Sequence, residues 1–197
     1  SGILTYGMGS SAFVAESGGQ ITLTGVSGFV SGEDTAGAFV SGAGSTIVTN
    51  ASYINTYGNN SAGMSVVDGG AATIHGGAFV TGNYHGTLIS NSVALLAQGT
   101  GSKITVDQGG SVTTYGAASA GAVAQGGAFI DFKGYGVFTY ETGSTGAIAD
   151  GTDGNGTASK VVISNAIVRT TGPSSAGVRA TGGGTMSVVG GEITTGY

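Results

Sequence analysis

The chain contains no cysteine, no tryptophan and a single proline, and only five basic and ten acidic side chains occur among its 197 residues. The absence of cysteine excludes a disulfide framework and a thiolate metal site. One proline excludes collagen, which needs abundant proline and glycine at every third position. Because 40% of the residues are hydrophobic, the composition also differs from that of disordered chains. We therefore expect the chain to fold.

Long runs of basic or apolar residues are also missing. The net charge is −5 and the basic residues are scattered, so the sequence has neither a basic patch for nucleic acid nor a polybasic stripe for anionic lipid. No run of about 18 apolar residues predicts a membrane-spanning helix. The chain opens at Ser1 without the charged and apolar regions of a signal peptide. We expect an excised segment with no nucleic-acid partner and no membrane insertion of its own.

Glycine is abundant, with 42 copies, and it falls within an internal repeat. A glycine closes an apolar run every 24 to 34 residues; these glycines are Gly7, Gly32, Gly58, Gly82, Gly116, Gly172 and Gly196, with Glu141 in the equivalent place of one repeat. Each repeat continues with a polar turn, often Ser-Ala-Gly, then an apolar stretch, a glycine-rich turn and a strand-like segment. Helices are disfavoured, because glycine costs about 1 kcal/mol per residue in a helix interior. The repeat predicts a β-solenoid.

Large aliphatic residues recur once per repeat and alternate with outward positions, as in a strand with one buried face. The column that we expect to form the core is Ile21, Ile47, Ile74, Ile104, Ile130, Val161 and Met186. Stacked copies of this face would bury one continuous core. The prediction is an all-β fold, a right-handed parallel β-helix of about eight partial coils of 24–26 residues, in a single segment over residues 1–197.

Three glycine-rich phrases carry a family resemblance. Residues 177–184, GVRATGGG, their echo at 121–127, GAVAQGG, and the closing 191–196, GEITTG, resemble the passenger repeats of pertactin-like autotransporters. The resemblance extends over the whole chain, but these phrases report coil geometry and no chemistry. It implies a segment of a longer passenger that is exported through the outer membrane, secreted or held at the bacterial cell surface. Passengers of this family are adhesins, toxins or proteases, and the shared rod does not choose among them.

The sequence contains no motif typical of a catalytic site. The protease branch of the family would need a Gly-Asp-Ser-Gly motif, which is absent, and His75 and His85 have no neighbouring Ser-Gly element. A polar column closes the second strand of each coil without placing two carboxylates on adjacent coils; it comprises Glu16, Ser41, Asp68, Gln98, Gln125, Asp150 and Thr181. We expect no enzyme, no catalytic residue, no cofactor and no metal.

Two alternative functions stay open. One is a polysaccharide-lyase-like or glycosidase-like enzyme, which would use clustered carboxylates on one sheet. The other is an ice- or crystal-binding solenoid that uses threonine pairs, such as Thr113-Thr114 and Thr170-Thr171, in a flat array. Insertions and intervening tyrosines make that array irregular.

Two sets of side chains are candidates for an interaction surface. Four tyrosines follow threonine in four coils, with Ser31 and Thr81 in intervening coils, and either stack on sugars and partner side chains or cap coil corners; they are Tyr6, Tyr57, Tyr115 and Tyr140. A second set forms a ridge in the second strand: Val14, Phe39, Val66, Leu96, Val123 and Ile148, continued by Arg179. A slip of one residue exchanges this ridge with the flanking alanines. The resemblance favours Val178 and Ala180 inside, and hence an exposed ridge.

Two insertions lengthen the repeat, at residues 83–92 and 150–159. Insertions in solenoids form loops, often on a binding face. The first contains the candidates Tyr84 and His85, and the second contains Asp150, Asp153 and Asn155. Residues 150–156 resemble part of a calcium loop but lack its downstream bidentate glutamate, so a plain turn is the alternative. We expect adhesion to a host-cell surface protein or glycan, or association of the chain with itself.

Overall fold

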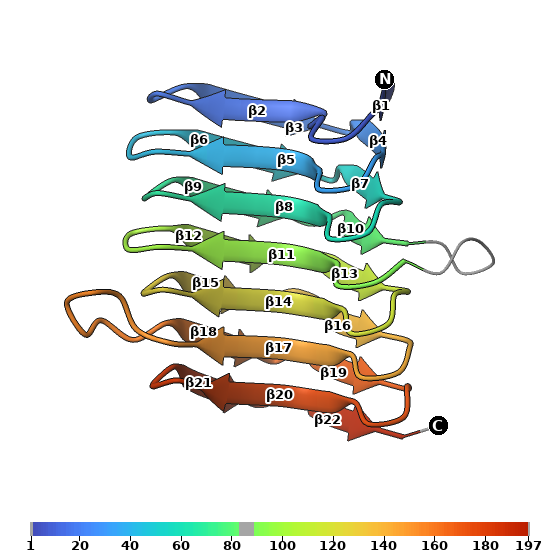
Figure 1. Cartoon of the computed structure of the whole chain (residues 1–197), viewed down its shortest axis with the longest axis vertical. Helices are drawn as coiled ribbons and strands as arrows, with labels where there is room; N and C mark the ends of the chain where they lie inside the picture. Colours follow the sequence, from blue (N-terminus) through green and yellow to red (C-terminus); the bar gives the residue numbers. More distant parts are fainter. Residues whose placement is uncertain (1, 83–88, 197) are drawn as a thin grey trace.

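The protein is a stack of β-strand coils (Figure 1). The computed structural model describes residues 2–82 and 89–196, and these residues form 22 strands and no helix. The strands lie in three parallel sheets, and each coil adds one strand to sheet B, one to sheet C and one to sheet A, in that order. This is the right-handed parallel β-helix that the repeat predicts, with seven three-strand coils preceded by β1.

The strand bounds are regular along the stack. Sheet A contains β1 (Gly2–Tyr6), β4 (Ser27–Ser31), β7 (Tyr53–Thr56), β10 (Ala78–Thr81), β13 (Ser111–Thr114), β16 (Gly136–Thr139), β19 (Ile167–Thr170) and β22 (Glu192–Thr195). Sheet B contains β2 (Phe13–Glu16), β5 (Ala36–Ser41), β8 (Ala62–Val67), β11 (Val93–Gln98), β14 (Ala120–Gln125), β17 (Thr145–Asp150) and β20 (Ala176–Thr181). Sheet C contains β3 (Gln20–Thr24), β6 (Thr46–Asn50), β9 (Ala71–His75), β12 (Lys103–Asp107), β15 (Phe129–Phe132), β18 (Lys160–Ser164) and β21 (Thr185–Val189).

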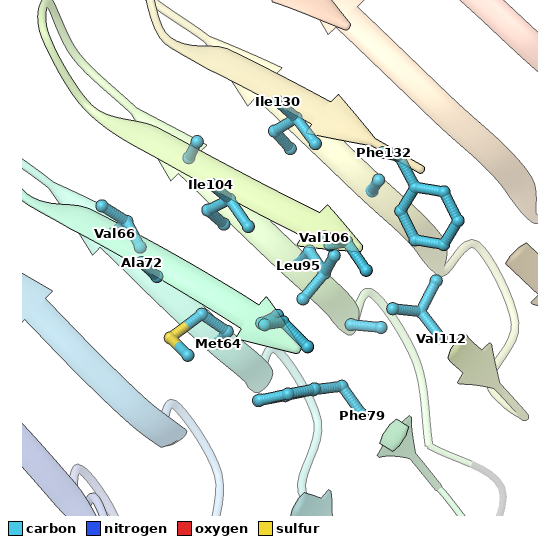
Figure 2. Close-up of a cluster of buried hydrophobic side chains, with 14 of the residues drawn as sticks. Met64, Val66, Ala72, Phe79, Leu95, Ile104, Val106, Val112, Ile130 and Phe132 are labelled. Atoms are coloured by element: carbon cyan, nitrogen blue, oxygen red, sulfur yellow. The ribbon is translucent and has the colours of Figure 1, made fainter. Parts of the chain in front are cut away.

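The predicted aliphatic column lies inside the coils. Its central members are completely buried: Ile47, Ile104, Ile130 and Val161. Ile21 and Met186, in the end coils, are partly exposed and pack against the same core. Figure 2 shows how residues of all three sheets meet there, with Met64 and Leu95 of sheet B opposite Ile104 of sheet C and Phe79 of sheet A. The core prediction is confirmed for these positions.

Ile74 was assigned to the wrong column. It pairs with Thr49 and Val106, and Ala72 fills the predicted place beside Ile47 and Ile104. The strand starts at two small residues, Ala71 and Ala72, which lack the large side chain that marks the column elsewhere. Ile74 is nevertheless buried, because a slip of two residues keeps a side chain on the same face of a strand.

A ladder of serine hydroxyls closes the corner between sheets A and B, called the A–B corner below. Ser61 Oγ donates to Gly32 O (3.0 Å) and Ser92 Oγ donates to Gly58 O (3.0 Å). Each hydroxyl also accepts from the backbone of the preceding coil, as from Ser61 N–H to Ser92 Oγ (3.4 Å). Backbone groups that the turn removes from the sheets are thereby satisfied. This explains the serine of the Ser-Ala-Gly phrase.

The glycine of the same phrase marks a close approach between sheets B and A. A Cβ at Gly121 would collide with Val137 Cγ1 and would lie 2.6 Å from the Gly146 carbonyl oxygen. Gly146 and Gly177 occupy the equivalent places in the next two coils, against Val168 and Ile193. Ala94 fills the equivalent place in the coil before Gly121, so that coil accommodates one methyl group. Around Gly121, Gly146 and Gly177 the sheets lie too close for a Cβ, so at these three coils packing requires the glycine.

A buried threonine column runs up the inner face of sheet A. It consists of Thr56, Thr81, Thr114, Thr139 and Thr170, all completely buried. Val30 occupies the same column beside Thr56. Among the described residues, none offers these five threonine hydroxyls a hydrogen-bond partner. β-Branched side chains fit a packed strand face, but an unpaired buried hydroxyl costs stability.

Candidate interaction surfaces

The predicted tyrosines share one outward column at the end of sheet A. Tyr57, Tyr115 and Tyr140 directly follow the buried threonines, so alternation along the strand turns their rings outward. The Tyr115 and Tyr140 rings stack, with centroids 5.0 Å apart and planes 12° apart. Tyr6, paired with Ser31, lies at the N-terminal end of the column and is 71% exposed. The proposed strip of tyrosines is therefore a single column.

One intervening position in this column differs from the prediction. The Gly82 amide donates to Thr56 O, and the Tyr115 amide to Thr81 O, so Gly82 lies between Tyr57 and Tyr115. Thr81 is buried one position earlier in the strand. The column thus reads Tyr6, Ser31, Tyr57, Gly82, Tyr115, Tyr140 and Thr171. Its small members separate the tyrosines into three groups.

Further aromatic side chains on the outer face of sheet A were not predicted from the sequence. Asn55 donates its amide Nδ2 to Tyr57 Oη (2.9 Å) and lies 3.3 Å from Tyr53 Oη. Phe29 packs on Tyr53, with ring centroids 6.0 Å apart. Burial, and secondarily the neighbouring Tyr53, raise the pKa of Tyr57 above its ordinary value. The phenol therefore stays neutral, and the amide of Asn55 fixes where it points. The alternation of residues 53–57 could have predicted that Tyr53, Asn55 and Tyr57 share one face of the strand.

Two small hollows open along the tyrosine column. The Tyr57 hollow, about 210 Å³, is lined by Ser31, Gly32, Glu33, Tyr57, Gly58, Asn59 and Ile89. The Tyr140 hollow, about 200 Å³, is lined by Tyr140, Glu141, Thr171, Gly172 and Pro173. Each occurs where a tyrosine neighbours a small hydroxyl residue of an adjacent coil, Ser31 of the preceding coil for Tyr57 and Thr171 of the following coil for Tyr140. In both, an aromatic ring, a hydroxyl and a carboxylate lie on one open concave surface.

The outer face of sheet B carries the apolar ridge in the orientation that we expected. Alanines and Val40 point inward in the alternate positions, and Ala97, Ala124 and Ala149 are completely buried. The outward column is Val14, Phe39, Ser65, Leu96, Val123, Ile148 and Arg179. Exposure decreases from 45% at Val14 to 8% at Val123, which packs between its neighbours. The outward orientation of the ridge is thus confirmed except at Val66, but among its apolar members only Val14 is exposed, and Val123 is buried.

Val66 does not belong to this ridge, although the sequence predicted it there. It is completely buried, and Ser65 occupies the outward place between Phe39 and Leu96. The polar column was counted from Asp68, whereas Val67 fills that place and Asp68 lies in the turn with φ 54°. Aspartate tolerates this left-handed conformation better than most residues. Because this strand ends in the apolar Val67, the first polar residue lies one position later, and a shift of one residue exchanges the faces of a strand.

Ser65 leaves a groove in the ridge of about 420 Å³. Phe39 and Leu96 flank it, and the small side chains of Ala36 and Ala62 also line it. The remaining lining residues are Gly9, Ser11, Val14, Asp34, Thr35 and Asn60, besides Ser65 itself. The groove therefore forms where Ser65 interrupts the ridge beside other small residues, among them Ala36 and Ala62.

The second insertion is an ordered hairpin that projects between sheets B and C (Figure 1, orange loop). Thr152 and Ala158 form an antiparallel bridge across it. Asp153 Oδ1 accepts from the amides of Asn155 (2.9 Å) and Thr157 (2.7 Å), and Asp153 Oδ2 accepts from Thr100 Oγ1 (2.8 Å). The Thr157 amide, followed by the Thr100 hydroxyl, lowers the pKa of Asp153. This carboxylate holds the hairpin against the turn after β11.

The other loop candidates are placed separately. Asp150 accepts from Thr181 Oγ1 in the next coil (2.5 Å), and Asn155 is exposed at the hairpin tip. Tyr84 and His85 lie outside the described residues. The part of the chain that is described contains no group of three or more histidine, aspartate or glutamate side chains that could hold a metal ion.

The remaining candidate chemistry is dispersed over other surfaces. His75 Nδ1 lies 2.6 Å from Asp107 Oδ1 on the adjacent coil of sheet C. The threonine pairs point to opposite faces, since Thr114 and Thr170 are buried whereas Thr113 and Thr171 are not. These pairs therefore do not form a flat array. Over residues 2–82 and 89–196, no helix is long and apolar enough to cross a membrane.

Comparison with known protein families, with curated proteins and with solved structures finds no match. The class of the protein, a parallel β-helix built from stacked coils, follows from its own sheets and register. The resemblance to autotransporter passengers rests on the glycine-rich phrases, and these mark turns and close approaches: Gly182 and Gly183 have positive φ, and Gly177 contacts Ile193.

Proposed function

We propose that this chain is a segment of an adhesive rod, secreted or displayed at a bacterial cell surface, as the resemblance to pertactin-like passengers implies. The observation that supports this best is the outer surface of the A–B corner. An outward-facing, half-buried tyrosine column and two hollows follow one edge of the rod, and the apolar ridge of sheet B runs beside it. Tyrosine supplies a large amphipathic contact area at low entropic cost, which suits binding.

The partners that we propose are a host-cell surface protein or glycan, or a second copy of the chain. Nucleic acid is not among them, because basic residues are few and separated: Lys103 and Lys160 flank Phe129 on sheet C, whereas Arg179 lies on sheet B. The segment acts by contact and performs no catalysis. Its acidic groups bind neighbouring residues individually, as Asp150, Asp153 and Asp107 do.

The proposal is tested by retention of the purified, labelled chain on host cells. We expect saturable binding to cells, or formation of oligomers, by protein with a β-rich circular dichroism spectrum. A folded chain that binds neither cells nor itself would contradict the proposal. Incubation with pectin, other acidic polysaccharides and casein should give no turnover, and activity that is lost on changing Asp68 or Asp150 would point to an enzyme instead.

A further inference from the structure

We infer that the A–B corner binds a neutral glycan chain, with the Tyr57 hollow and the Tyr140 hollow as two sugar subsites. This inference rests on the proposed adhesive function and names the chemical class of its ligand. It is carried by the repetition of one set of groups at two places on the same edge of the rod.

Each hollow offers complementary groups for one sugar ring. A pyranose has an apolar C–H face and a rim of hydroxyls, so it needs an aromatic surface beside hydrogen-bond acceptors and donors. Tyr57 with Ser31 and Glu33 provides this in one hollow, and Tyr140 with Thr171 and Glu141 in the other. Volumes of about 200 Å³ are below those of pockets that enclose drug-sized ligands, and suit a single ring held at the surface.

The charge of the hollows selects neutral sugars. Glu33 lines one hollow and Glu141 the other, and neither lining includes lysine or arginine. A uronic acid or sialic acid would bring its carboxylate close to these carboxylates, and like charges in contact disfavour binding. Glu33 is already held by Asn59 Nδ2 (3.1 Å), so its position is defined before a ligand arrives.

The spacing of the hollows suits an extended chain. The Tyr57 hollow lies between Ser31 and Tyr57, and the Tyr140 hollow lies between Tyr140 and Thr171. Their centres are four coils apart in one column, which at the usual strand spacing is about 19 Å. The Tyr115 ring, stacked on Tyr140, lies between the two hollows. A glycan of several sugars that follows the rod axis would therefore occupy both hollows, and the second contact would form intramolecularly with a gain in affinity.

Calorimetry with defined oligosaccharides tests this inference. The probes are the hexamers of glucose with β-1,4 and α-1,4 links, of β-1,4-mannose and of N-acetylglucosamine, their dimers, and a galacturonic acid hexamer. We expect at least one neutral hexamer to bind, its dimer to bind at least about tenfold more weakly, and the acidic hexamer not to bind. Tyr57→Ala and Tyr140→Ala should each weaken binding about tenfold, whereas Tyr57→Phe, which keeps the ring, should retain it.

Tyr135→Ala is the matched control, because Tyr135 is 61% exposed and lines neither hollow. Each variant is first shown to be folded by circular dichroism and thermal unfolding. Absence of binding to every neutral hexamer overturns the glycan inference. So does binding that is unchanged in folded Tyr57→Ala and Tyr140→Ala. If the chain still binds cells in either case, the adhesive function stands with a protein partner; if it binds neither cells nor itself, the proposed function also fails.

Discussion

At the scale of single residues, the unpaired threonine hydroxyls of the core are expected to cost stability. The hydroxyl of Thr114 is completely buried without a partner, and Val30 shows that valine fits the same column. Replacing an unpaired buried hydroxyl by a methyl group removes a desolvation cost. We expect Thr114→Val to raise the free energy of unfolding by about 1 kcal/mol, measured by urea denaturation.

Thr113→Val, one residue earlier and on the outer face, is the control and should change stability by less than about 0.5 kcal/mol. If Thr114→Val destabilised the protein while Thr113→Val did not, the buried threonine hydroxyls would have to be satisfied in solution, contrary to the geometry of the column.

Gly121 tests the close approach of sheets B and A. A methyl group there meets Val137 and the Gly146 backbone, so the sheets would have to separate. We expect Gly121→Ala to lower the free energy of unfolding by about 1–3 kcal/mol. Gly154→Ala, where nothing lies within 4 Å and φ is not positive, is the matched control and should be neutral or slightly stabilising. Equal effects of the two changes would show that the Ser-Ala-Gly glycine is not a packing requirement.

At the scale of elements, the 150–159 hairpin depends on one carboxylate. The lowered pKa of Asp153 means that its ionised form stabilises the folded hairpin. This stabilisation is present above the ordinary pKa of 3.8 and is lost as the pH falls through the lower pKa of the folded state. The protection factors of the Asn155 and Thr157 amides, which compare exchange with its intrinsic rate at the same pH, should therefore fall at acidic pH. In Asp153→Ala these protection factors should be low at every pH while the thermal midpoint of the rod stays the same. A lowered midpoint would make the hairpin a structural part of the rod.

How far each strand could be predicted from the sequence depended on the residues that begin and end it. Alternation predicted the inward faces of β12, β15 and β18 correctly, because each contains large aliphatic residues at alternate positions. It misplaced Ile74 and Val66, which belong to β9 and β8. In β9 two small residues hide the start of the inward pattern, and in β8 the apolar Val67 stands where most other coils end the strand in a polar residue. The register with the neighbouring coils resolves both positions, and one coil read alone does not.

The surfaces between coils were less predictable than the strands. The tyrosine column was found from its Thr-Tyr pairs, but both hollows depend on which residue of an adjacent coil lies beside each tyrosine. Ser31 and Thr171 are 26 and 31 residues from Tyr57 and Tyr140, and these offsets follow only from the register. Asn55, which orients Tyr57, is an ordinary polar residue in the sequence. Its role appears only when its amide is seen between two phenols.

For the whole molecule, we expect self-association. The end coils expose Leu4 and Ile193, and the ridge exposes Val14 on one side of the rod. Exposed strand edges and apolar patches promote pairing of chains. Light scattering should give a mass above that of a monomer. Val14→Lys with Leu96→Lys should reduce it if packing is lateral, whereas Leu4→Lys with Ile193→Lys should reduce it if rods stack end to end.

Thr73→Lys, on the outer face of sheet C, adds a charge away from both surfaces and serves as the control for solubility. A protein that stays monomeric at high concentration and moderate salt would exclude both modes of association. Val66 is unsuited to this test, because it is completely buried and a lysine there would unfold the coil.

The adhesive role of the A–B corner is tested most directly by binding of the labelled chain to epithelial cells, measured by flow cytometry for the wild type, the Tyr57→Ala/Tyr140→Ala double variant and the Tyr135→Ala control. All three proteins are first matched for folding by circular dichroism. We predict saturable binding by the wild type and the control, and a loss of about a hundredfold in the double variant. Equal binding by all three folded proteins, or no binding by the wild type, would contradict it.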